Sequence, residues 1–233
     1  MKYCYETHLH TSPASRCARV SVREALDFYR LLGYAGVFIT NHYIEPESKM
    51  GQGKSYAERT ELFFADYEEG LRIGKEFGLS VFCGVEITYG GSDFLVYGLD
   101  KSWYLSHPEL ETLKHSEKLK LLTESGAFVI HAHPFRESWY IDHIRLFPRA
   151  VDGVEVVNAC RTEFENRMAR EYADNYGLLH FAGSDNHHGI GQKLLAGIEM
   201  TAPIADDRDF VDRIRRGEYT CFTRQNPCLP KDV

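Results

Sequence analysis

Lys2-Tyr3-Cys4-Tyr5-Glu6-Thr7-His8-Leu9-His10 opens the chain with a strand-like run that ends in two histidines. Side chains two apart on a strand point to the same face, so both imidazoles can reach one metal ion at the C-terminal end of the strand. A surface His-x-His pair also arises by chance in a chain with 11 histidines. We expect His8 and His10 to be metal ligands because other strands of the chain also end in residues of this kind.

Four further apolar runs are each followed directly by residues that can bind metals. In a barrel-like α/β fold, the carboxyl ends of successive strands meet at one mouth. Histidine and carboxylate side chains that converge there suit a divalent transition metal. The sequence therefore predicts a shared metal centre. The four stretches are Thr40-Asn41-His42, Gly84-Val85-Glu86, His131-Ala132-His133-Pro134 and Gly183-Ser184-Asp185-Asn186-His187.

Length and charge limit the possible classes of protein. A chain of 233 residues, 43% hydrophobic and without a linker or repeat, predicts one domain over residues 1–233. The net charge of −7 disfavours an extended nucleic-acid-binding surface. A small or end-bound nucleotide stays compatible, because divalent cations would reverse the local sign of the charge.

The start of the chain lacks the apolar core of a signal peptide, and no run approaches the roughly 18 apolar residues of a membrane span. We therefore expect a cytoplasmic protein without a membrane partner. The six cysteines include no Cys-x-x-Cys pair, so a zinc ribbon is not expected and the thiols should be reduced. The oligomeric state is left open.

Helix-like and strand-like segments alternate, which predicts an α/β fold with a largely parallel sheet. Ser21-Val22-Arg23-Glu24 is a capping box that opens a helix ended by Gly33. Gly90-Gly91 predicts a hairpin and hence one antiparallel strand pair. About eight strands are enough for an irregular barrel. Further helices are expected over 57–77, 108–124, 163–176 and 209–216, and strands over 35–40, 80–88, 93–99, 127–131, 153–157, 178–182, 198–201 and 219–223.

The order of these motifs resembles the PHP (polymerase and histidinol phosphatase) family over nearly the whole chain. Each motif is weak alone, but six of them in order over some 180 residues are specific. They are His8-Leu9-His10, Thr40-Asn41-His42, Gly84-Val85-Glu86, His133-Pro134, Glu155-Val156-Val157-Asn158 and Gly183-Ser184-Asp185-Asn186-His187.

The resemblance implies a single-domain, distorted (β/α)7 TIM-like barrel that holds two to three divalent ions, such as zinc, iron or manganese, at its C-terminal mouth. The ligands of a first metal would be His8, His10, Glu86 and Asp185. Glu86 would bridge to a second metal that His133 also binds, and His42 and His187 would bind a third.

The chain departs from the family pattern at two ligand positions. Many members have Asp where Asn41 stands, and we interpret Asn41 as supporting the ligands rather than binding metal. The third metal often takes a further ligand near the first motif, where Cys17 is the nearest candidate. A thiolate there would favour zinc or iron over magnesium, although an ordinary small thiol is an equally good interpretation.

A further ligand histidine that many members place between Glu86 and His131 has no clear counterpart. His107 and His115 lie at or within an expected helix, where solvated positions are more common. His131 lies two residues before His133, so on a strand both side chains would face the same side. His131 could therefore take the place of the missing ligand or contact the substrate, or it could be a packed strand histidine.

Arg136 comes after His133 in a loop at the same mouth, and a guanidinium is suited to binding phosphate, although a solvated surface arginine is the alternative. Arg161 and Asn158 are further substrate-binding candidates. Asn158 and Glu155 could instead orient the metal ligands.

These residues predict a metal-dependent phosphoric ester hydrolase, with Glu86, Asp185 and Arg136 as catalytic residues. A metal-bound hydroxide would attack phosphorus, most simply in a phosphomonoester. The substrate would be a small phosphate ester, either similar to histidinol phosphate or a nucleotide or 5′ oligonucleotide end. Two alternatives stay open: a barrel metallohydrolase of C–N bonds, and a catalytically silent metal-binding module. Serine-hydrolase, Walker and dinucleotide motifs are absent from the sequence.

Overall fold

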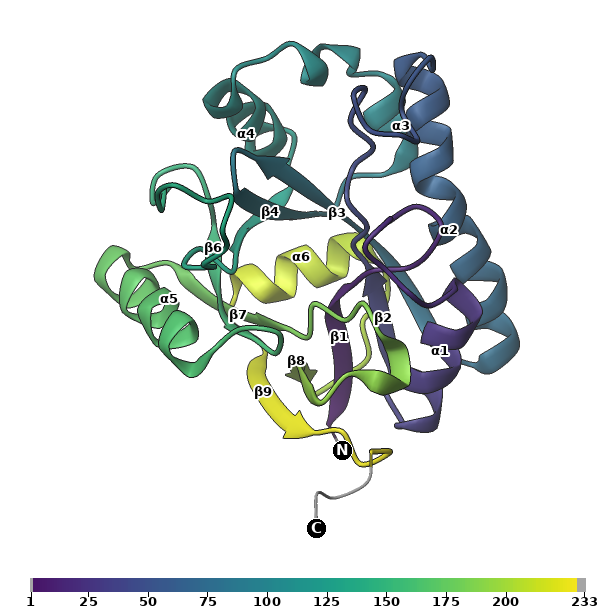
Figure 1. Ribbon diagram of the computed structural model, residues 1–233. Helices are drawn as coiled ribbons and strands as arrows, with labels where there is room; N and C mark the ends of the chain where they lie inside the picture. Colours follow the sequence, from purple (N-terminus) through teal and green to yellow (C-terminus); the bar gives the residue numbers. More distant parts are fainter. Residues whose placement is uncertain (1, 230–233) are drawn as a thin grey trace.

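A computed structural model describes residues 2–229, in which one mixed sheet of nine strands curls into a barrel-like wall (Figure 1). This confirms the α/β barrel-like fold expected from the sequence. The strands lie in the order β7-β6-β5-β4-β3-β2-β1-β8-β9. They are β1 (Tyr3–Leu9), β2 (Gly36–Ile39), β3 (Ser80–Tyr89), β4 (Ser92–Tyr97), β5 (Phe128–Ala132), β6 (Gly153–Asn158), β7 (Leu179–Gly183), β8 (Leu194–Met200) and β9 (Thr220–Gln225).

Helices pack around this sheet. The α-helices of the described residues are α1 (Val22–Leu31), α2 (Tyr56–Phe77), α3 (Lys101–Leu105), α4 (His115–Glu124), α5 (Glu163–Tyr176) and α6 (Asp207–Arg215). Figure 1 shows α1 and α2 along the side of β1 and β2, and α5 next to β6 and β7. The capping box expected at α1 is present, because Ser21 and Glu24 each accept the backbone N–H of the other.

The strand directions bring six C-terminal strand ends to one mouth. Strands β1, β2 and β3 are parallel, as are β5, β6 and β7, and β4 joins the two sets by antiparallel pairing on both sides. The expected hairpin forms at Gly90 and Gly91, whose φ angles of 52° and 89° suit glycine. Residues at the ends of distant strands can therefore meet at this mouth.

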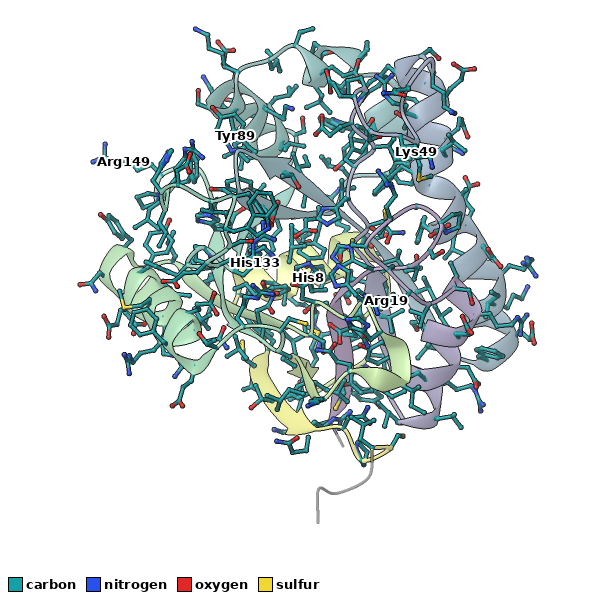
Figure 2. All side chains as sticks on the ribbon, in the orientation of Figure 1. His8, Arg19, Lys49, Tyr89, His133 and Arg149 are labelled. Carbon is teal, nitrogen blue, oxygen red and sulfur yellow. The ribbon has the colours of Figure 1, made fainter. Side chains whose placement is uncertain are left out.

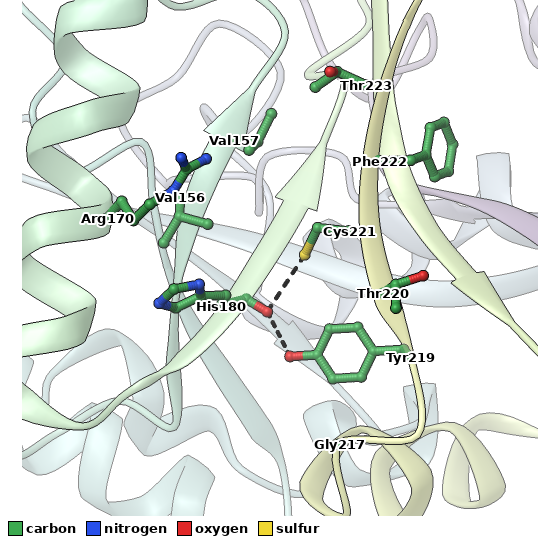
Figure 3. Close-up of a pocket in the computed structure, with 10 residues that line it drawn as sticks. All are labelled: Val156, Val157, Arg170, His180, Gly217, Tyr219, Thr220, Cys221, Phe222 and Thr223. Atoms are coloured by element: carbon green, nitrogen blue, oxygen red, sulfur yellow. Dashed lines mark hydrogen bonds between the residues drawn. The ribbon is translucent and has the colours of Figure 1, made fainter.

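The barrel nearly closes between β7 and β1. At the mouth, the N–H of His10 donates to the carbonyl of Asn186 at 3.0 Å, and the N–H of Asn186 donates to the carbonyl of His8 at 3.1 Å. Farther from the mouth, the edges β7 and β9 are joined by side chains instead. Figure 3 shows the Tyr219 hydroxyl and the Cys221 thiol donating to the carbonyl of His180, beside a hollow of about 510 Å³.

Helix α6 fills the end of the barrel opposite the mouth. Phe210, Val211 and Ile214 are buried in the interior cluster that also contains Phe38 and Phe181. Arg215 donates to the carbonyl of Ala127 at 2.8 Å, just before β5 begins. The interior is thus apolar at one end and polar at the mouth, so the mouth is where ligands can enter.

The single helix expected over 108–124 is wrong, because the segment divides into two pieces. A 3-10 turn, Pro108–Glu111, buries Leu110, and α4 begins anew at His115. The Glu117 carboxylate accepts the N–H of Lys114 at 3.0 Å and so caps the second piece. The short helix α3, capped by Asp100, was not expected either. None of the helices in residues 2–229 has the length and hydropathy of a membrane-spanning segment.

Candidate metal centre

A bulge in β1 directs the two opening histidines into the barrel. Tyr5 points into the interior cluster and Leu9 points outward against α1. Regular alternation from Tyr5 would therefore turn His8 outward. The register with β2 shifts between Glu6 and Leu9, which reverses the alternation and brings His8 to the inside.

His8 and His10 direct the same ring nitrogen at the same point. Their Nε2 atoms lie 3.1 Å apart, and both side chains are fully buried. The Nδ1 of His8 lies 2.8 Å from Glu155 Oε1, and the Nδ1 of His10 lies 3.0 Å from Ser15 Oγ. Partners on Nδ1 fix the ring orientation and leave the Nε2 lone pairs for a metal ion. The expectation of a ligand pair thus agrees with the geometry.

Glu86 lies at the centre of the cluster, on β3. Its Oε1 faces Nε2 of His8 at 3.3 Å and Nε2 of His133 at 3.4 Å. Its Oε2 faces Nε2 of His10 at 3.3 Å and Nδ1 of His42 at 2.9 Å. A carboxylate with one oxygen toward each set of imidazoles can bridge two ions.

Asp185 and His133 both stand on backbone with positive φ, at 53° and 27°. Non-glycine residues rarely adopt such angles, and they gather at functional sites. The turns direct the side chains inward: Asp185 Oδ1 lies 3.4 Å from Nε2 of both His8 and His10. His133 comes directly after the end of β5 and reaches the same group from the other side, as the labels of His8 and His133 in Figure 2 show.

Asp93 is a candidate ligand that the sequence analysis missed. It is 1% exposed on β4, and its Oδ2 lies 3.8 Å from Nε2 of His133. Asp93, His42 and Glu86 also offer ligand atoms within 4.8 Å of one another. Its inward position results from hairpin pairing, because Asp93 shares its face with Leu95, which pairs with Glu86. Counting residues across the Gly-Gly turn would have found it, and it occupies the region where a further histidine was sought.

The buried carboxylates fall into two kinds. Both oxygens of Glu155 accept hydrogen bonds, and Glu6 accepts three backbone N–H groups and the Tyr29 hydroxyl. By contrast, neither oxygen of Asp93 nor Oε2 of Glu86 has an aligned donor among the described residues. The Arg136 guanidinium lies 3.1 Å from Asp93 Oδ2, and the His42 imidazole lies 2.9 Å from Glu86 Oε2. A buried anion is costly without such a positive neighbour, so these oxygens fit a cation. Glu155 and Glu6 position the ligands instead.

A third group of ligand atoms lies on the outer side of the cluster. Cys17 Sγ lies 3.1 Å from Nε2 of His187. Cys17, His42, His187 and His10 offer atoms within 4.8 Å of one another. Burial would raise the pKa of the Cys17 thiol, but the hydrogen bond to His42 and the neighbouring imidazoles lower it. A thiol with a lowered pKa is the better metal ligand.

The pKa shifts in the cluster result from its alternating charges. Burial would lower the pKa of His8, but Glu155, Asp185 and Glu86 hold it well above its usual value. Burial would likewise raise the pKa of Asp185 and Glu86, and the imidazoles hold both well below the usual range. The carboxylates are thus charged, and the donor set fits divalent metal ions.

Comparison with known proteins agrees with this geometry. Residues 163–219 match the profile of the PHP-associated family, PHP_C. A two-domain protein from Bacteroides vulgatus, described as containing a predicted PHP-like metal-dependent phosphoesterase, has a similar structure, with a TM-score of 0.70, 16% identity, and coverage of 95% of this chain and 65% of that protein. The family profile thus matches the C-terminal part of the chain, and the structural likeness shows the fold. The chain spans just under two thirds of the length of the Bacteroides vulgatus protein.

Two further solved structures have a similar fold. Comparison with curated proteins found no match. A protein from Bifidobacterium adolescentis, described as a candidate metal-dependent phosphoesterase, has a TM-score of 0.56 at 15% identity, covering 80% of this chain and 88% of that one. An amidohydrolase from Chromobacterium violaceum, solved with sulfate and no metal, has a TM-score of 0.57 at 13% identity, covering 93% and 97%. Likeness at this level shows the fold and leaves the reaction to be argued from the residues.

His131 does not join the ligands of the centre, and the expectation that it faces the same side as His133 is wrong. The positive φ at His133 interrupts the alternation of β5. That angle turns His133 inward, whereas His131 keeps the outer face that alternation with the interior Ile130 and Ala132 gives it, stacked against Phe94 at 5.0 Å between ring centroids. Burial, with the charge of His133, lowers the pKa of His131 to about 3. It packs in the outer layer and does not contact a substrate at the mouth.

His107 and His115 also lie outside the centre. His107 is held by the carbonyl of Trp103 at 2.7 Å from its Nδ1. His115 is buried rather than solvated, stacked on Tyr89 with 4.1 Å between ring centroids. Burial and the charges of Lys118 and Arg145 lower its pKa to about 4.

The expected substrate-binding residues have different surroundings. The Arg136 guanidinium lies 3.1 Å from Asp93 Oδ2, at the edge of the cluster. Asn158 donates to Glu155 at 2.9 Å and to Asp185 at 3.2 Å, so it orients ligands. Arg161 pairs with no carboxylate in the part of the chain that the structure describes. Asn41 bonds to Thr11 and so supports the ligand-bearing loops, as expected.

Two hollows flank the centre. One, of about 370 Å³, opens beside Cys17 and His42, and its surface is mainly apolar, with Ile44 and Met50 in its lining next to the charged Arg16 and Glu45. The other, of about 620 Å³, lies beside Arg136 and the 95% exposed Trp139. The first hollow thus reaches candidate ligands of the centre, whereas the second reaches its edge at Arg136.

Proposed function

We propose that the protein is a metal-dependent phosphoesterase that acts as a phosphomonoesterase on small phosphate esters. The observation that carries this proposal is the position of the Arg136 guanidinium next to Asp93, a buried carboxylate of the candidate metal centre. A guanidinium can bind two oxygens of a tetrahedral phosphate, whereas carboxylates alone would repel it. Among the described residues, Arg136 is the one arginine or lysine paired with a carboxylate of the cluster.

Each residue has a separate task in this proposal. Glu86, Asp185 and the imidazoles of His8, His10 and His133 would hold the ions. Bound divalent ions would activate water and neutralise the charge of the phosphate. Arg136, now paired with Asp93, would turn to the phosphate when an ion neutralises Asp93. Asn158 and Glu155 would keep Asp185, His8 and His133 in place.

The size of the hollows supports a small substrate. The hollow beside Cys17 is of the volume that takes a small organic group, and its apolar lining suits the part of the ester without charge. The net charge of −7 argues against binding to a long nucleic acid. Histidinol phosphate-like esters and nucleoside monophosphates are both of this class.

A release assay tests the proposal. The purified protein would be loaded with Zn²⁺, Mn²⁺ or Fe²⁺ in turn and given a panel of phosphomonoesters, a phosphodiester and matched amides. We expect phosphate release from at least one small monoester, and loss of that release in Arg136→Met with metal content unchanged. Arg149→Met, a loop arginine farther along the same segment, is the matched control.

Hydrolysis of C–N bonds is the second candidate, because a protein of the same fold is described as an amidohydrolase. Amide turnover without phosphate release, under the same metal loading, would favour this alternative. Full metal occupancy without turnover of either substrate class would favour a metal-binding module.

A further inference from the structure

Two kinds of donor set lie side by side in the centre. Glu86, Asp185 and Asp93 contribute oxygen ligands to the inner side, whereas the outer side offers sulfur and nitrogen. We propose that Cys17, His42 and His187 form a thiolate site that selects zinc, beside a carboxylate-rich pair of sites that does not. This inference rests on the metal binding of the proposed function and is independent of which bond is hydrolysed.

In each histidine, a contact at Nδ1 leaves Nε2 for the thiol. Nδ1 of His187 lies 2.8 Å from the backbone carbonyl of Asp185. A carbonyl only accepts, so Nδ1 carries the proton and the lone pair of Nε2 faces Cys17 Sγ at 3.1 Å. Nδ1 of His42 lies 2.9 Å from Glu86 Oε2, which leaves its Nε2 for the side of the thiol.

His10 belongs to the carboxylate side although it is close to both. Its Nδ1 bonds to Ser15, and its Nε2 lies 3.3 Å from Glu86 and 3.4 Å from Asp185. The ring of His10 stacks on that of His187 with 4.2 Å between centroids and so forms a wall between the two sides. The outer site therefore has three protein donors.

Three protein donors leave a fourth position open, which is the arrangement of catalytic rather than structural zinc. Cys17 is an exposed residue, and Cys17 and His42 both line the hollow of about 370 Å³. The open position can thus be filled from that hollow. Donor atoms around tetrahedral zinc lie roughly 3.3–3.7 Å apart. Cys17 Sγ and His187 Nε2 are 3.1 Å apart, and the ligand atoms of the whole group lie within 4.8 Å of one another.

Ligand softness gives the selectivity. A thiolate with two imidazoles is a zinc donor set, whereas carboxylates with imidazoles also suit manganese and iron. With zinc limiting, the first zinc ion should therefore enter the outer site. The expected result is a centre with different metals on its two sides.

Zinc-edge X-ray absorption tests the inference. The full chain would be stripped with a chelator and given one equivalent of Zn²⁺ and excess Mn²⁺. We expect one sulfur neighbour of zinc at about 2.3 Å, together with nitrogen neighbours. In Cys17→Ser the sulfur neighbour should disappear. The affinity of the protein for Zn²⁺, measured in competition with Mn²⁺, should fall at least about tenfold.

Cys160→Ser is the matched control, because this thiol also lies near the cluster, 3.3 Å from the carbonyl of Asp185. It should keep the sulfur neighbour. A zinc spectrum with nitrogen and oxygen neighbours alone in the wild type, or a sulfur neighbour that survives in Cys17→Ser, would overturn the inference and leave the hydrolase proposal standing. No metal uptake at all would overturn both.

Discussion

Two groups of histidines, one at the mouth and one under the outer helices, have opposite surroundings. At the mouth, His8, His42 and His133 face carboxylates, and their pKa values are raised despite burial. In the outer layer, His115 and His131 face aromatic rings, and burial lowers their pKa values to about 4 and about 3.

The comparison teaches that burial alone does not mark a metal ligand. His8 and His131 are both fully buried. They differ in what faces their nitrogens: Glu86 and Asp185 in one case, and no hydrogen-bond partner within residues 2–229 in the other. A carboxylate opposite the imidazole, rather than the imidazole itself, separates the two roles.

Removing one negative charge from the mouth should have the largest effect. Asp185→Asn keeps the size of the side chain, and asparagine tolerates the positive φ at this position. Substituting a residue that only orients a metal ligand typically lowers metal affinity or activity by about 10- to 100-fold. Loss of a ligand itself should therefore lower phosphate release by more than about 100-fold.

The measurement is phosphate release together with metal content, and Asp174→Asn, an exposed aspartate paired with His180, is the control. Unchanged turnover in Asp185→Asn would remove this residue from the first metal site.

The same substitution at two histidines of one strand end tests the comparison directly. Nε2 of His133 faces Glu86. His133→Phe should therefore fail to bind the second ion, and its activity should fall at least about tenfold. His131→Phe should keep both. Since neither ring nitrogen of His131 has a partner among the described residues, its removal should leave stability unchanged or raise it by about 1 kcal/mol.

Metal analysis, activity and urea unfolding of the two variants separate these effects. Equal losses of metal in both variants would contradict the division into two groups.

Asp93 should have a smaller effect of the same kind. Asp93→Asn removes charge beside Arg136 and His133 without changing shape. We expect the affinity for one metal ion to fall about tenfold, while the other sites keep full occupancy. Titration of the stripped protein with Mn²⁺ measures this loss. An Asp93→Asn protein with wild-type affinity at every step would place Asp93 outside the centre.

The sequence could predict much of this centre because its ligands come after apolar strands in a regular order. His10, His42 and Asp185 follow β1, β2 and β7, and His8 and Glu86 lie in the last part of β1 and β3. Asp93 escaped notice because its place depends on pairing across the β3–β4 hairpin. A packed strand histidine was one of the interpretations left open for His131, but the expectation that it shares a face with His133 was wrong because the positive φ at His133 turns that side chain to the other face. Both facts are properties of three-dimensional pairing and turn geometry, which strand periodicity does not contain.

The outer-layer histidines should affect how the free energy of unfolding depends on pH, rather than affect activity. The pKa of His115 is about 4 in the folded chain and about 6.5 in the unfolded chain. Between these values the unfolded state binds the extra proton, so stability is lost as the pH falls below about 6.5. At pH 5 this loss is at most about 2 kcal/mol.

His115→Phe keeps the ring on Tyr89 but cannot bind a proton. Its unfolding free energy, measured in urea with chelator present, should therefore fall less than that of the wild type between pH 7 and pH 5, while phosphate release at pH 7 stays the same. Parallel pH profiles for the two proteins would mean that His115 takes up its proton in the folded state. The contrast between carboxylate-facing and ring-facing histidines would then fail at this residue, because burial among aromatic rings would not be enough to keep an imidazole neutral.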